Sequence, residues 1–243
     1  MIKYLCIDDE GAEVINPILA NLSTAHNDLN IVHERPKNFS DQIEELQATM
    51  GQQKYHGLIL DLRLDMFKSP EGEKANYRAF ALAQEIRTRV TEGKLNDFPI
   101  VLCSVHTRIR RSYASDDTSH DLYDAVYEKE NIPDNAAVIA NELVSLVKGY
   151  RFIRKQLDGS RPPFYKMILA DSEAGNALNP SVLSMFDKKR PVHEYARFIL
   201  NELIRIPSPL IDERILVARL GIDIKKSTDW EKLKSALSRL SAY

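Results

Sequence analysis

The sequence predicts an α/β protein: a five-stranded, doubly wound parallel sheet followed by an all-helical C-terminal domain. Two observations carry this prediction. Up to about residue 150, short apolar stretches alternate with longer amphipathic ones, as in sheets covered by helices on both faces. After residue 157 no strand pattern recurs, and prolines and capping residues mark the starts of helices instead.

Five short apolar stretches in the first half are candidate strands. In the third of them, residues 57–60 form a continuous apolar stretch, which is typical of a strand buried on both faces. The candidates cover residues 2–7, 29–34, 56–61, 98–104 and 124–129.

Helices are predicted between these strands. Pro17 occupies a tolerated first helical position, so a helix is expected over 16–22. Ser40 is expected to open a second helix, over 39–50. Further helices are predicted at 76–90 and 135–157, the last with an apolar seam at Leu143, Val147, Tyr150 and Ile153.

The second half is divided into helices by its own start and stop signals. Residues 158–163 are predicted to form a linker, which gives a first domain over 1–150 and a second over 151–243. Helices are expected at 180–186, from Pro191 to about 206, from Ser208-Pro209 to Gly221, and after a Thr228/Glu231 capping box. The chain ends close to the last apolar position of this final helix, which is consistent with a truncated domain.

Composition restricts the classes of protein. Of 243 residues, 44% are hydrophobic, which is enough for a sizeable core. Cys6 and Cys103 lie inside apolar stretches and predict buried thiols in a reducing compartment. The N-terminus has no apolar stretch long enough for a signal peptide or a membrane span, so a cytoplasmic location without membrane association is expected.

Charge is distributed unevenly between the halves. Up to Gly149 there are 16 basic and 24 acidic residues, against 17 and 11 from Tyr150 onward. Such asymmetry indicates two functional halves that attract each other, or a basic half that meets an acidic partner. Ordinary solvated surfaces would give the same counts.

Chemically active side chains follow the predicted strands. Asp8, Asp9 and Glu10 follow the first strand and Asp61 follows the third, while Ser104 and Lys129 end the fourth and fifth. In a parallel sheet these residues meet at one edge, where ligands bind. Clustered carboxylates suit Mg²⁺, which takes oxygen ligands. One carboxylate can then accept a phosphoryl group as an acyl phosphate, while a hydroxyl and an ammonium hold its oxygens.

Four sequence pieces resemble the receiver domain of two-component response regulators. They are "LCIDDE", "GLILDLRLD", "PIVLCSVHT" and "AVYEKE", in the family's order and each at a strand end. The resemblance covers roughly residues 1–150. It implies a flavodoxin-like sheet of order 2-1-3-4-5.

The resemblance also implies roles for individual residues. Asp61 would be the phospho-acceptor, and Asp9 would bind Mg²⁺ directly while Asp8 binds it through water. The backbone carbonyl of Arg63 would complete the protein's share of the metal shell. Ser104 would hydrogen-bond the phosphoryl group, and Lys129 would pair with a phosphoryl oxygen. The expected donor is a sensor histidine kinase or a phosphotransfer protein, and no enzymatic activity is expected beyond self-phosphorylation and dephosphorylation.

Three departures from the family pattern concern the switch that follows phosphorylation and access to the phosphoryl group. Glu130 follows the strand-five lysine where the family usually has proline, and Val126 occupies the position of the usual switch aromatic, with Tyr127 beside it. Val105 is larger than the very small residue that usually follows Ser104. A degenerate receiver that binds partners without phosphorylation is therefore an alternative.

Enzyme alternatives explain fewer of the residues. A haloacid-dehalogenase-like phosphatase needs a second aspartate at position 63, which is Arg63. A metal-dependent nuclease could use Asp8, Asp9, Asp61 and Asp65 but leaves Lys129 and Ser104 without a role. No glycine-rich phosphate loop is present.

The second half is predicted to be a helical output module that binds a protein partner or dimerises. Residues 213–240 invite a helix-turn-helix interpretation, but the interval from Gly221 to Thr228 is too long for its tight turn. The second of these helices offers few side chains that read bases. DNA binding, as in a transcriptional response regulator, is the less favoured alternative.

Overall fold

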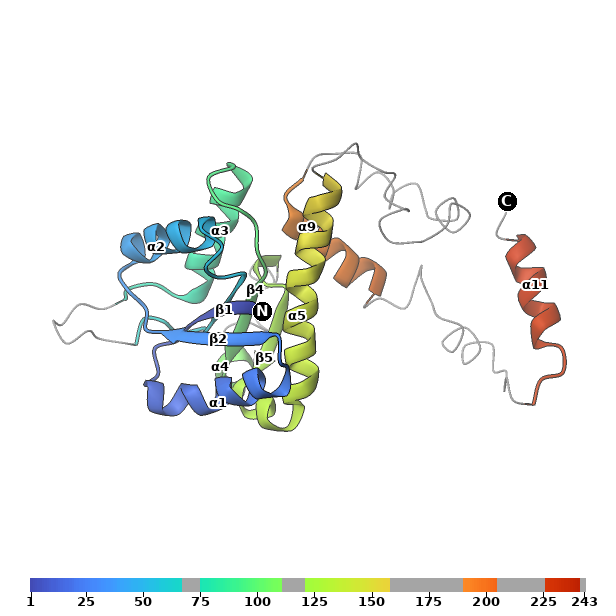
Figure 1. The fold of residues 1–243 in the computed structure, drawn as a ribbon, viewed down its shortest axis with the longest axis horizontal. Helices are drawn as coiled ribbons and strands as arrows, with labels where there is room; N and C mark the ends of the chain where they lie inside the picture. Colours follow the sequence, from blue (N-terminus) through green and yellow to red (C-terminus); the bar gives the residue numbers. More distant parts are fainter. Residues whose placement is uncertain (67–74, 111–120, 158–189, 205–225, 241–243) are drawn as a thin grey trace. The chain divides into compact units, whose positions relative to one another are not determined.

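The computed structural model describes residues 1–66, 75–110, 121–157, 190–204 and 226–240 (Figure 1). The predicted linker and the predicted helices at 180–186 and 208–221 lie outside these residues. By internal contacts the chain divides into two compact units. One comprises Met1–Phe152 with Pro191–His193, and the other Ile153–Arg190 with Glu194–Tyr243.

The first unit contains a five-stranded, all-parallel sheet. Its strands are β1 (Ile2–Ile7), β2 (Leu29–Glu34), β3 (Gly57–Leu60), β4 (Ile100–Ser104) and β5 (Ala125–Glu128). They lie in the order β2-β1-β3-β4-β5, which confirms the predicted flavodoxin-like topology. The reversal of strand order beside β1 and β3 places their carboxyl ends at the point where such sheets bind ligands.

Helices cover both faces of the sheet. They are α1 (Ala12–Ala25), α2 (Phe39–Gly51), α3 (Ala79–Thr91), the short α4 (His106–Arg108) and α5 (Ile132–Leu157). One core cluster joins the sheet to α2 and α3, and the other joins it to α1 and α5 (Figure 1). Because successive strand residues face opposite sides, Leu58 and Leu60 belong to the first cluster and Ile59 to the second.

The close approach of β1 and β3 requires a glycine. A Cβ atom at Gly57 would collide with the ring of Tyr4, which is fully buried. The Tyr4 hydroxyl donates to the carbonyl of Leu143 at 2.8 Å and so ties β1 to α5. These contacts fix the register that brings the ends of the strands to one level.

Several predicted helix boundaries are wrong. Helix α1 begins at Ala12, not at Pro17, which lies inside it. Burial of Ile15, Leu19 and Leu22 along one face extends the helix upstream of the proline. Helix α2 is capped by Asn38 rather than Ser40, because the Asn38 side chain accepts the Asp41 N–H.

Two other helices also begin away from their predicted positions. Helix α3 begins at Ala79, three residues later than predicted, after a stretch whose Tyr77 packs in the core. Helix α5 begins at Ile132, three residues early, and contains a non-helical residue at Asn135. Its predicted apolar seam is buried as far as Ile153.

The described part of the second half is helical. Helix α9 (Val192–Phe198) continues into the π-helical segment η4 (Ile199–Ile204), and α11 spans Trp230–Leu240. Helix α11 begins at Trp230, so Asp229 rather than the predicted cap Thr228 directly precedes it. Trp230 is buried, whereas Leu233 is exposed.

Within the described residues, no helix combines the length and the apolar character needed to span a bilayer.

Candidate functional site

The parallel sheet brings the predicted site residues to one edge. Asp8 directly follows β1, and Asp61 directly follows β3. Ser104 is the last residue of β4, and Lys129 follows β5 as the first residue of a 3-10 turn, η3 (Lys129–Asn131). The register pairs Ile7 with Leu60, Leu60 with Leu102, and Ser104 with Glu128, so these ends lie at one level.

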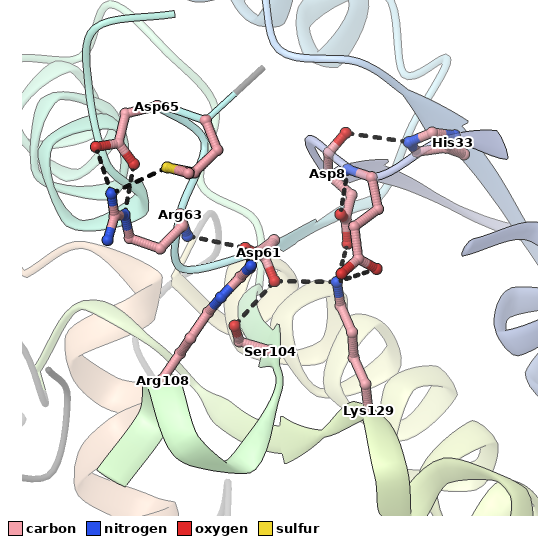
Figure 2. A network of polar contacts seen from close by, with 10 residues as sticks. Asp8, His33, Asp61, Arg63, Asp65, Ser104, Arg108 and Lys129 are labelled. Carbon is pink, nitrogen blue, oxygen red and sulfur yellow. Dashed lines mark hydrogen bonds and ion pairs between the residues drawn. The ribbon is translucent and has the colours of Figure 1, made fainter. Parts of the chain in front are cut away.

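Lys129 lies at the centre of the site (Figure 2). Its Nζ is 2.7 Å from Asp8 Oδ2, 3.0 Å from Asp61 Oδ1 and 3.0 Å from Glu10 Oε2. Burial alone would lower the pKa of this amine, but the negative charges of Asp61 and Asp8 outweigh burial and raise it. The ammonium therefore stays charged and offsets part of the acidic charge around it.

Both carboxylate oxygens of Asp61 have hydrogen-bond donors (Figure 2). Oδ1 accepts the Ser104 hydroxyl at 2.9 Å in addition to its contact with Lys129. Oδ2 accepts the Arg63 N–H at 2.8 Å and the Arg108 guanidinium at 3.2 Å. The side chain is fully buried, so its charge depends on these four donors rather than on water.

Asp8, Asp9 and Asp61 form an acidic cluster that could hold a metal ion. One oxygen from each lies within 4.8 Å of the others. Burial, followed by repulsion from Asp61, raises the pKa of the Asp8 carboxyl. Burial, Asp61 and Asp8 together raise the pKa of Asp9 to about 6. The cluster therefore carries more negative charge than its protein partners neutralise.

One carboxylate oxygen of the acidic cluster lacks a hydrogen-bond partner among the described residues. Asp9 Oδ1 is buried and has no hydrogen-bond partner among the residues that the structure describes. By contrast, Asp8 Oδ1 accepts the Glu10 N–H at 3.0 Å. A buried carboxylate oxygen without a donor is costly, and a cation would satisfy it.

Arg63 approaches Asp61 through its backbone and not through its side chain. Its guanidinium is paired with Asp65 (Figure 2). Nε donates to Asp65 Oδ1 at 2.6 Å, and Nη2 donates to Asp65 Oδ2 at 3.0 Å. This pairing fixes the turn after β3. The role predicted for the Arg63 carbonyl in metal binding stays a prediction.

The departures at the end of β5 produce specific contacts with the start of α4. Glu130, at the position where the receiver family that the sequence resembles usually has proline, accepts the His106 N–H with both oxygens, at 3.2 and 3.1 Å. The distance between His106 Nδ1 and Glu128 Oε1 is 2.6 Å. The segment after Ser104 is thus joined to the segment around Lys129 by two carboxylates.

Tyr127 lies next to Val126, the position at which the receiver family that the sequence resembles has its switch aromatic, and its side chain is held by a hydrogen bond. The Tyr127 hydroxyl donates to Glu142 of α5 at 2.6 Å. Val126, at the switch position itself, packs against the core cluster under α2 and α3. Tyr127 is thus held at the surface of α5, and Val126 is an aliphatic residue packed against the core.

Two residues of the site were not assigned a role by the sequence analysis. Glu10 reaches Lys129, and Arg108 reaches Asp61. Glu10 follows Asp8-Asp9 directly, so its position in the sequence could have placed it at the site. Arg108 belongs to a charged stretch in which the sequence offers no means of choosing one arginine from its neighbours.

Comparison with protein-family models gives no match for this chain, and comparison with curated proteins gives none. The functional argument therefore rests on the geometry of the site.

Proposed function

We propose that this protein is a phospho-accepting receiver in which Asp61 takes up a phosphoryl group. A single arrangement supports the proposal: the Asp61 carboxylate ends a central strand between an acidic pair, a lysine and a hydroxyl. Lys129 and Ser104 both contact Asp61 Oδ1, at 3.0 and 2.9 Å. These groups suit stabilisation of phosphoryl oxygens.

In the proposed step, a carboxylate oxygen of Asp61 attacks the phosphorus of a small donor or of a phosphohistidine on a partner protein. The new P–O bond forms as the bond to the leaving group breaks, and that group departs with the electron pair. The product is an acyl phosphate. Hydrolysis restores the carboxylate, because a water oxygen attacks phosphorus and the bond to Asp61 breaks.

The acidic cluster fits Mg²⁺ as the cofactor of this step. Its donors are all hard carboxylate oxygens, and the unpaired Asp9 Oδ1 supplies an oxygen that lacks any other partner. Asp8, Asp9, Asp61 and the Arg63 carbonyl would hold the ion. When bound, Mg²⁺ would neutralise charge on the incoming phosphoryl group.

A second function is favoured by the burial of the acceptor. The Asp61 side chain is fully buried, and both of its oxygens are already engaged. Val105 directly follows Ser104, where the family that the sequence resembles usually has a very small residue. These observations support the alternative of a receiver-shaped module that binds its partners without phosphorylation.

The proposed output is binding of a protein partner, or of a second copy of this chain, by the helical second half. The unequal charges of the two halves support an electrostatic contribution to this binding. DNA binding is the less favoured output. Its test is duplex binding that falls steeply with salt, whereas a change in oligomeric state after treatment with acetyl phosphate supports the protein-binding output.

Intact-mass measurement after incubation with acetyl phosphate, with and without Mg²⁺, tests the proposed function. Wild type should gain one phosphoryl group only when Mg²⁺ is present, and Asp61→Ala should gain none. Asp28→Ala removes an exposed carboxylate from the turn before β2 and should behave as wild type. A folded wild type that gains nothing would contradict phosphorylation and favour the phosphorylation-independent module.

A further inference from the structure

Arg108 is the cation of the site that comes from outside the strand ends. It is the last residue of α4, and its NH1 donates to Asp61 Oδ2 at 3.2 Å (Figure 2). Only Val105 separates Ser104 from α4, so the serine and the arginine approach Asp61 from one stretch of chain. They engage different oxygens of the carboxylate, because Ser104 donates to Oδ1.

The side chain of Arg63, the other arginine near Asp61, is paired with Asp65. The Arg63 guanidinium is held by Asp65 through two hydrogen bonds and also contacts the sulfur of Met66 at 3.3 Å. Among the described residues, Arg108 is thus the arginine whose side chain reaches the acceptor carboxylate.

Arg108 is less tightly held than Lys129. The Lys129 side chain is 4% exposed and contacts three carboxylates, whereas that of Arg108 is 34% exposed and contacts one carboxylate among the residues that the structure describes. A long, half-exposed guanidinium can reorient about its stem at little cost. A second oxygen acceptor placed near Oδ2 would therefore draw Arg108 before it disturbed Lys129.

Transfer to Asp61 would provide that acceptor. The carboxylate loses its own negative charge when it becomes an acyl phosphate. The phosphoryl oxygens then carry a charge of about −2. Guanidinium groups match phosphoryl oxygens in geometry and charge, and can donate two hydrogen bonds at once. The best partner of Arg108 therefore shifts from Oδ2 to the phosphoryl oxygens.

We propose that Arg108 is a phosphoryl-binding residue that covers Asp61 in the resting protein and holds the phosphoryl group after transfer. This inference rests on the proposed function of Asp61. It gives α4 a direct link to the phosphorylation state, in place of the aromatic switch that Val126 and Tyr127 do not provide. The carboxylates of Glu128 and Glu130, which hold His106, extend the link to the end of β5.

A titration with beryllofluoride in the presence of Mg²⁺, followed by ¹⁹F NMR, tests the role of Arg108 in the full chain. The probe occupies the place of a phosphoryl group on an aspartate without covalent transfer. Arg108→Ala should weaken its binding by about tenfold, as expected for loss of one hydrogen bond to a charged group. Arg108→Lys keeps the charge and should recover part of the affinity.

Arg110→Ala is the matched control, because it removes the same charge from an exposed position two residues further along. It should bind the probe as wild type does. Amide spectra supply a second readout: the probe should shift the α4 resonances in wild type but not in Arg108→Ala. A role confined to folding would change thermal stability without this selective loss.

The outcomes separate the two proposals. A wild type that binds the probe with the same affinity as Arg108→Ala overturns the role of Arg108 and leaves Asp61 as acceptor. A folded wild type that binds no probe, and is not phosphorylated by acetyl phosphate, overturns the function of Asp61 and with it the role of Arg108.

Discussion

The two ends of the central strands each contain a buried cation among carboxylates, yet the two networks differ in kind. Lys129 lies at the carboxyl ends of the strands, and Arg87 of α3 lies near the amino ends of β4 and β5. Each residue is 4% exposed. The difference lies in whether the polar atoms around the cation all have protein partners.

At the amino ends the network is complete. Arg87 binds Asp97 and Asp124, each at 3.0 Å, and also donates to the carbonyls of Phe98 and Leu122. Asp124 also accepts the Ile100 N–H at 2.8 Å and the Tyr150 hydroxyl at 2.6 Å. The carboxylate of Asp97 accepts the His193 N–H at 2.6 Å.

At the carboxyl ends the network is incomplete. The carboxylates of Asp8, Asp9, Glu10 and Asp61 face two cations, Lys129 and Arg108. The pKa of Asp9 is raised to about 6, and its Oδ1 is without a partner in the described part of the chain. Removing one partner from a satisfied buried network is costly, whereas a buried acidic cluster that lacks a cation is a candidate binding site for one.

Arg87→Met should have the largest effect on stability. The change leaves Asp97 and Asp124 buried without their cation, so the free energy of unfolding should fall by about 3–5 kcal/mol. Urea unfolding followed by circular dichroism measures the loss. Arg89→Ala, two residues along the same helix, removes a part-exposed pair with Glu85 and should cost under about 1 kcal/mol.

A loss for Arg87→Met as small as that for Arg89→Ala would contradict the distinction between the two ends. It would mean that the buried network at the amino ends contributes no more than a surface ion pair.

Most of the fold was predictable because burial dictates it. Strand β3 is a continuous apolar stretch that is buried throughout, and the strand order followed from the receiver resemblance. Helix starts were less predictable, because tertiary burial carried α1 past Pro17 and a neighbouring side chain, Asn38, capped α2 instead of Ser40. Local signals place an element but do not fix its first residue.

The site was predictable where chemistry and strand ends coincide. Asp8, Asp9, Asp61, Ser104 and Lys129 each end or follow a strand, so the topology brings them together. Residues that reach a site from a turn or a helix do not lie at a strand end, so their position in the sequence does not show that they belong to the site.

Arg108 and the Arg87 network are examples of this limit. Arg87 did leave one trace in the sequence, because it adjoins the buried stripe of α3 formed by Leu82, Ala83 and Ile86. Charges beside an apolar stripe are common on helices, however, so the burial of Arg87 and its partners Asp97 and Asp124 are identified only by the fold.

Mg²⁺ should stabilise the protein by completing the acidic cluster. At a concentration about 100 times its dissociation constant, the ion should raise the free energy of unfolding by about 2.7 kcal/mol. Asp9→Asn should lose most of this gain, yet be more stable than wild type without metal, because it removes a repelling charge. Unfolding with Mg²⁺ and with a chelator measures both effects.

The gain from Mg²⁺ should depend on pH with a definite sign. The pKa of Asp9 in the folded protein, about 6, lies above its ordinary value, so the metal-free protein loses stability as pH rises through about 4 to 6. Deprotonation also frees the ligand, so at pH 5 metal affinity should be about tenfold weaker than at pH 7. Equal affinities at the two values would exclude Asp9 as a ligand.

His193→Ala should have the smallest effect, and it tests the network at the amino ends from its periphery. His193 Nδ1 lies 2.8 Å from Asp97 Oδ2, but the backbone N–H of residue 193 binds the same oxygen and survives the substitution. The expected cost is therefore about 1 kcal/mol, the value of one hydrogen bond. His26→Ala, in a surface turn, should change stability by less than about 0.5 kcal/mol.

The pH dependence of the His193 contact should oppose that of Asp9. Burial alone would raise the pKa of Asp97, but the hydrogen bond from His193 and the charge of Arg87 outweigh burial and lower it. Asp97 therefore stabilises the fold above its unfolded pKa of about 3.9, and this contribution is lost as pH falls through the folded value. The cost of His193→Ala should be full at pH 7 and shrink in acid. A cost that instead grows below pH 4 would show that the ring does not act through the Asp97 carboxylate.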